Sequence, residues 1–136
     1  MKPKQLYRTV KIRHSDAKSN SKPGKKTKKL EHIFDLTIDQ IIDLYYKQNG
    51  LCARTGIPMT WVKRKNGKNQ NPCKPTSLSI DRIDSSKHYT IDNVQLVIYL
   101  YNTMKSERSD AKAEKDWKAL IRQADKHNTL KWSNTT

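Results

Sequence analysis

The chain has 136 residues with 28 Lys or Arg against 13 Asp or Glu, which gives a formal net charge of +15 at pH 7. This length allows one domain with a modest core, and a hydrophobic fraction of 34% indicates that part of the chain lies outside it. No run approaches about 18 apolar residues, which excludes a membrane partner, and the N-terminal stretch lacks the apolar centre of a signal peptide. Cys52 and Cys73 form no disulfide framework, so we expect a cytoplasmic location. A chain this basic usually binds a polyanion such as nucleic acid, the alternative being a ribosome-like or merely solubilising surface.

The N-terminal stretch 1–30 carries eleven of the 28 basic residues and a single acid, Asp16. Because the segment SDAKSNSKPGKKTKK within it has no apolar periodicity, we predict that 1–30 is a flexible basic arm, separate from a folded domain over 31–136. The alternative is a solvated tail that contacts nothing. The densest charges of the arm, and the candidates for contacts with nucleic-acid phosphates, are Lys25, Lys26, Lys28 and Lys29.

The first predicted helix follows Thr37, an N-cap whose capping box Gln40 completes, and it ends at Asn49-Gly50. Its apolar face is formed by Ile38, Ile41, Ile42 and Tyr45. Short extended pieces are expected over 51–62. A basic polar loop is expected over 63–76, in which Arg64 and Lys65 are candidate phosphate contacts and an unconstrained insertion is the alternative.

Two strands are predicted over 77–83 and 93–98, with turn residues at 85–87 between them. Helices are predicted over 99–105 and 110–126, so the expected fold class is α+β. The buried stripe of the last helix is predicted to consist of Ala113, Trp117, Leu120, Ile121 and Ala124.

Three polar residues, Asp81, Asn93 and Asn102, recur around this strand–loop–strand–helix segment. Such a layout can bring the Asp81 carboxylate and the Asn102 carboxamide to one point, and a few hard oxygen donors suit Mg²⁺. The structural alternatives are a surface ion-pair cluster around Asp81, Arg82 and Asp84, a cap or turn role for Asn93, and a solvent-facing position for Asn102.

At these residues the sequence resembles the HNH endonuclease family, whose core is a ββα-metal fold. In that family an Asp-His pair ends the first strand, an Asn opens the second, and a His or Asn lies on the helix. Asp81 matches the metal-binding Asp, Asn93 the Asn that braces the loop, and Asn102 the second metal ligand, while Lys105 matches a Lys three residues further on. The stretch QNGLCARTGIPM resembles the lead-in of phage and homing-type members, and the resemblance covers about residues 37–108.

One departure from the family concerns the general base, because Arg82 stands where the family has its catalytic His. The D-R-I-D form is a recurring variant of the family. Arginine stays protonated and does not accept a proton from water, but it can clamp a phosphate with two hydrogen bonds. The candidates for the base are Asp84, which we favour, His88, and a metal-bound water acting alone.

A second departure concerns the structural zinc that many HNH domains hold on two C-x-x-C pairs. Only Cys52 remains of the first pair, with Thr55 at its partner's position, and Ile98 and Tyr101 occupy the positions of the second. We therefore expect a small packed core there, with no structural zinc and with Cys52 as a buried hydrophobic residue.

The resemblance implies a small metal-dependent endonuclease that cleaves duplex DNA with Mg²⁺ or Mn²⁺ and leaves 5′-phosphate and 3′-hydroxyl ends. Asp81 and Asn102 would hold the ion, Arg82 would contact the scissile phosphate, and the arm, the 63–76 loop and Lys105 would contact the nucleic acid. The alternatives are a catalytically inactive HNH-derived nucleic-acid-binding or regulatory protein, and a structural RNA-binding protein that acts through its charge alone.

Overall fold

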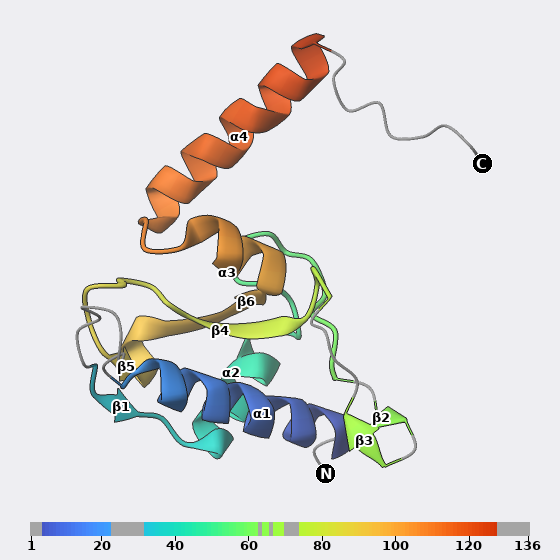
Figure 1. Ribbon diagram of the computed structural model, residues 1–136, viewed down its shortest axis with the longest axis vertical. Coiled ribbons are helices and arrows are strands. Elements are labelled where there is room, and N and C mark those ends of the chain that lie inside the picture. Colours follow the sequence, from blue (N-terminus) through green and yellow to red (C-terminus); the bar gives the residue numbers. More distant parts are fainter. Residues whose placement is uncertain (1–3, 23–31, 63, 66, 70–73, 128–136) are drawn as a thin grey trace.

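The computed structural model describes residues 4–22, 32–62, 64–65, 67–69 and 74–127. Within this part of the chain, a two-stranded antiparallel sheet lies between helices, with α1 and α2 on one side and α3 on the other (Figure 1). The α+β class predicted from the sequence is confirmed.

The central sheet pairs β4 (Leu78–Arg82) with β6 (Val94–Ile98). All five residues of β6 are buried, because helices cover the strand on both faces. The register places Asp81 opposite Gln95. Both predicted strands are therefore present, each within two residues of its expected limits.

Helix α2 (Ile38–Lys47) begins at the predicted capping box, in which the Thr37 Oγ1 accepts from the Gln40 amide at 3.1 Å and the Gln40 Oε1 accepts from the Thr37 amide at 2.9 Å. The helix gives way to a turn at Asn49 and Gly50, with φ of 55° and 70°. The φ of Gly50 favours glycine, and a Cβ there would lie 2.8 Å from the Tyr45 hydroxyl oxygen, so a larger residue would also displace the Tyr45 side chain.

Helix α1 (Lys4–Asn20) replaces most of the flexible arm that we predicted, and for these residues the prediction is wrong. Leu6 and Val10 are fully buried and Ala17 nearly so, and the three share one helix face at i, i+4 and i+11. The Thr9 hydroxyl also accepts a hydrogen bond from the Val62 amide at 2.8 Å. This narrow apolar face packs against the core, so α1 is docked although most of its other residues are charged or polar. The four lysines at 25, 26, 28 and 29 lie outside the described residues.

Two further pairs of short strands lie outside the central sheet. β1 (Phe34–Asp35) pairs in parallel with β5 (Tyr89–Thr90), which is followed by a 3₁₀ turn, η1 (Ile91–Asn93). β2 (Arg64–Lys65) and β3 (Lys68–Asn69) form an antiparallel hairpin within the stretch that we predicted as a loop. None of these short strands was predicted, because two residues carry no periodicity.

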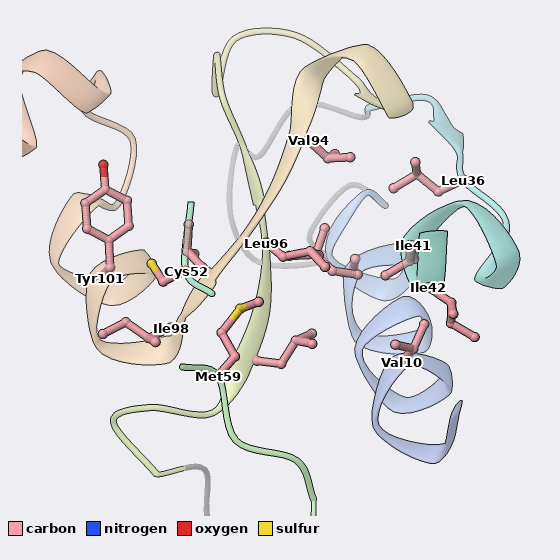
Figure 2. Packing of buried hydrophobic residues seen from close by; sticks show 14 of the residues in the cluster. Val10, Leu36, Ile41, Ile42, Cys52, Met59, Val94, Leu96, Ile98 and Tyr101 are labelled. Atoms are coloured by element: carbon pink, nitrogen blue, oxygen red, sulfur yellow. The ribbon is translucent and has the colours of Figure 1, made fainter. Parts of the chain in front are cut away.

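The core is one cluster of buried residues around the β4–β6 sheet (Figure 2). Leu96 packs toward Ile41 and Val10, and near the end of β6 Cys52 lies beside Ile98 and Tyr101. Cys52 is buried, so the expectation that it packs as a small hydrophobic residue is confirmed.

Helix α3 (Tyr99–Lys105) follows β6 directly, and α4 (Asp110–His127) extends away from the body (Figure 1). Ala113 and Ala124 are buried as predicted, but Trp117, Leu120 and Ile121 are exposed by 41%, 62% and 43%. The predicted stripe is therefore wrong at these three positions, because most of α4 lies beyond the reach of the core. Among the described residues, no helix has both the length and the apolar character that crossing a membrane requires.

Candidate functional site

A polar hollow of about 320 Å³ lies along the free edge of β4, between α1 and α3. Three predicted site residues, Asp81, Arg82 and Asn102, line it together. The full lining is Arg13, Ala17, Asn20, Ser79, Ile80, Asp81, Arg82, Ser85, Tyr89, Asn102 and Ser106. The structure therefore brings the two predicted metal ligands to the same side of the molecule.

The free edge of β4 positions these side chains through its backbone carbonyls. Alternate carbonyls of a strand point to the same edge, and here each one accepts a hydrogen bond from a different side chain. Arg13 Nε donates to Leu78 O at 2.8 Å, Asn102 Nδ2 to Ile80 O at 3.4 Å, and Lys105 Nζ to Arg82 O at 2.8 Å. Two helices are thus tied to the edge that borders the hollow.

Asp81 is buried, with 4% of the residue exposed. Its Oδ2 accepts from Lys105 Nζ at 2.7 Å and from Gln95 Nε2 at 2.9 Å, whereas its Oδ1 accepts no hydrogen bond from any described residue. Burial raises the pKa of the Asp81 carboxyl above its ordinary value, and the hydrogen bonds from Lys105 and Gln95 act in the opposite direction. One oxygen is therefore fixed inside the protein while the other remains available.

Asn102 is oriented in a similar way. Its Nδ2 donates to Ser79 Oγ at 2.7 Å and to Ile80 O at 3.4 Å. A backbone carbonyl only accepts, so the nitrogen of the carboxamide must lie on this side and Oδ1 on the other. No described residue donates to that Oδ1.

The two donor types, a carboxylate oxygen and a carboxamide oxygen, suit a divalent cation of the magnesium type. Mg²⁺ takes one or two protein oxygens and keeps several waters, and the hollow offers a carboxylate oxygen and a carboxamide oxygen without protein partners. The Asp81 Oδ2 is already bonded to an ammonium group, so Asp81 would supply one oxygen rather than two.

Asn93 is buried and closes the loop between β4 and β5. Its Oδ1 accepts from the Asp84 amide at 3.0 Å, and its Nδ2 donates to Asp84 O at 3.1 Å and His88 O at 2.8 Å. This is the bracing arrangement that the resemblance implies for Asn93.

The two residues proposed as the general base, Asp84 and His88, are not among the lining residues of the hollow. Asp84 is exposed, and hydrogen bonds from the Ser86 hydroxyl and amide hold the pKa of its carboxyl below the ordinary value. The Nδ1 of His88 accepts from the Ile33 amide at 2.9 Å, so the basic nitrogen of the neutral ring is already occupied. Neither group is placed to take a proton in the hollow.

The cationic side of the hollow comes from two arginines. Arg82 donates from Nη1 to Lys87 O at 3.1 Å, and its guanidinium lies 4.9 Å from the centre of the Tyr89 ring. Arg13, from α1, also lines the hollow, and we did not predict it because we expected its segment to be a flexible arm. The signal that would have found it is its place on the buried face of α1, three residues after Val10.

Lys105 is not a surface contact for nucleic acid, and our prediction for it is wrong. The side chain is fully buried, and its ammonium bonds to Asp81, the carbonyls of Arg82 and Ile83, and Asp110. A group enclosed by these oxygens does not reach a phosphate. Arg64 and Lys65 lie on the β2 strand of the outer hairpin, and their side chains are outside the described part.

The place where the resemblance to HNH proteins would put a structural zinc is apolar in this chain. Cys52, Ile98 and Tyr101 are buried together (Figure 2). Thr55 is exposed. A single thiol beside two hydrophobic side chains does not supply the ligand set of a structural zinc. The Tyr101 hydroxyl instead donates to Asp110. The pKa of Tyr101 is raised, mainly by burial and next by the neighbouring Asp110 carboxylate.

Comparisons with known proteins do not assign the chain to a family. No family model matches it, and neither curated proteins nor solved structures give a match.

Proposed function

We propose that the chain is a metal-dependent DNA endonuclease of the HNH type that hydrolyses phosphodiester bonds. The observation that carries the proposal is the common hollow in which Asp81, Asn102 and Arg82 meet at the free edge of β4. The order of these residues along the chain also follows the pattern of the family. The phage or homing-type origin rests on the resemblance of residues 37–108 alone.

Asp81 and Asn102 would hold Mg²⁺ or Mn²⁺ through the two oxygens that lack protein partners. When bound, such an ion neutralises charge on a phosphodiester under attack and lowers the pKa of a water that it holds. Arg82 and Arg13 carry positive charge at the same hollow and would bind the phosphate, and Asn93 keeps the loop that carries Arg82's partner Lys87 closed.

Duplex DNA is the proposed substrate because the chain combines a net charge of +15 with this cationic hollow. Basic residues on the opposite side of α1 from Arg13, among them Lys4, Arg8, Lys11 and Lys18, would contact phosphates outside the hollow. Such contacts carry no sequence information by themselves.

The second candidate, an inactive HNH-derived nucleic-acid-binding protein, is favoured by one observation. Among the described residues that line the hollow, Asp81 is the only carboxylate and there is no histidine, so a side chain suited to deprotonate water is missing. Under this proposal Arg82 and Arg13 bind phosphate and no bond is cleaved.

The test incubates purified protein with supercoiled plasmid and Mg²⁺ or Mn²⁺. We expect nicks that disappear with EDTA, and at least a hundredfold slower nicking for Asp81→Asn and Asn102→Ala. Asp125→Asn, which changes an exposed carboxylate on α4, is the matched control and should cleave normally. Equal nicking by all of these proteins would remove the assignment. Binding that weakens with salt, ignores EDTA and gives no nicks would establish the second candidate instead.

A further inference from the structure

Lys105, the buried lysine of α3, is surrounded by more oxygen atoms than the neutralisation of one carboxylate would require. The Lys105 Nζ lies 2.7 Å from Asp81 Oδ2, 2.8 Å from Arg82 O, 3.2 Å from Ile83 O and 3.3 Å from Asp110 Oδ1. An ammonium group has three protons, so four oxygens at these distances fix its position closely.

The first consequence concerns the side chain of Asp81. Lys105 and Gln95 both donate to Oδ2, so rotation of the carboxylate would break two hydrogen bonds to a buried oxygen. Oδ1 is therefore held in the one orientation that leaves it without a protein donor.

The second consequence concerns the backbone around the site. Lys105 also bonds to the carbonyls of Arg82 and Ile83, which end and follow β4. Asn102 lies three residues before Lys105, on the same short helix, and bonds to Ile80 O. The lysine thereby fixes the element that carries Asn102 relative to the strand end that carries Asp81.

We propose that Lys105 is the positioning residue of the candidate metal site, holding Asp81 Oδ1 and Asn102 Oδ1 in place for a divalent cation. This inference rests on the proposed function. It has a clear rival, in which Lys105 only balances buried charge. In that case its ammonium would repel a cation bound at Asp81, and its removal would tighten cation binding.

The sign of the change in Mg²⁺ affinity separates the two roles. We would titrate Mg²⁺ into ¹⁵N-labelled protein without DNA and follow the amide signals of Asp81 and Asn102. Lys105→Met, which keeps the length of the side chain but removes the ammonium, should weaken Mg²⁺ binding about tenfold or more. Lys112→Met, which removes an exposed ammonium on α4, should leave it unchanged.

Unchanged or tighter binding by Lys105→Met would overturn the positioning role while leaving the metal site intact. If the unmodified protein binds no Mg²⁺, the proposed function falls with it. A loss that persists at pH 8.5 excludes protonation of Asp81 as its cause. Should Lys105→Met fail to fold, Lys105→Arg keeps the charge but not the shape. Weaker Mg²⁺ binding by this variant supports positioning, and unchanged binding contradicts it.

Discussion

The buried ion pair between Lys105 and Asp81 makes a quantitative prediction about stability. Lys105→Met leaves the carboxylates of Asp81 and Asp110 close together without the ammonium that lies 2.7 Å from one and 3.3 Å from the other. Removing one partner of a buried pair costs about 3–5 kcal/mol in the free energy of unfolding, because the remaining charge is left unpaired. We expect this variant to lose stability in that range.

Asp81→Asn should lower the free energy of unfolding by less than Lys105→Met does. The reason is that Lys105 keeps Asp110 and the carbonyls of Arg82 and Ile83 as partners. We expect a loss of about 1.5–3 kcal/mol, the range for one hydrogen bond to a charged group. The double variant removes one carboxylate together with the ammonium. It should therefore be more stable than the sum of the two single losses implies, by about 1–3 kcal/mol.

Urea unfolding followed by circular dichroism measures all three variants. The matched control is Lys112→Met, whose ammonium lies at the same 2.7 Å from the carboxylate of Asp116 but is 57% exposed. An exposed pair contributes little, and the control should change stability by less than about 1 kcal/mol. A loss for Lys105→Met as small as that of the control, or strictly additive losses in the double variant, would refute the reasoning.

The remaining predictions concern α1, the loop and α4, and the same unfolding assay checks them. Leu6→Ala should cost about 2–5 kcal/mol because Leu6 is fully buried, while Tyr7→Ala, at a residue 47% exposed, should cost far less; equal small losses would mean that α1 is not docked. Asn93→Ala removes three hydrogen bonds and should cost about 2–4 kcal/mol, and an unchanged midpoint would contradict the bracing role. Leu120→Ser should stay within about 0.5 kcal/mol, whereas a loss above 2 kcal/mol would restore the predicted buried stripe of α4.

The sequence predicted the elements whose signals are local. The capping box of Thr37 and Gln40, the two central strands and α3 all follow from patterns that span a few residues. Asp81 and Asn102 lie in one hollow for a related reason. They belong to a strand pair that is followed directly by a helix, and this short connection leaves few ways to arrange the two residues.

What the sequence did not predict depends on contacts between distant segments. Arg13 donates a hydrogen bond to the carbonyl of Leu78, 65 residues away, and no sequence pattern near Arg13 predicts that partner. Lys105 is the clearest case, because lysine is almost never fully buried unless it is paired, and its partners come from β4 and α4. The docking of α1 was missed because its narrow apolar face lies among many charged residues.

The free edge of β4 explains why structural and functional roles coincide at this site. An edge strand leaves carbonyls that need donors, and here Arg13 and Asn102, which line the hollow, and the buried Lys105 supply them. Asn102 uses its nitrogen for the edge and Asp81 uses Oδ2 for the buried lysine, so each residue keeps one oxygen that the fold does not consume. The fold uses the bonded atoms of these residues and leaves the other two oxygens open to solvent or to a ligand. Those two oxygens, rather than the residues as wholes, are the atoms that the proposed cation would occupy.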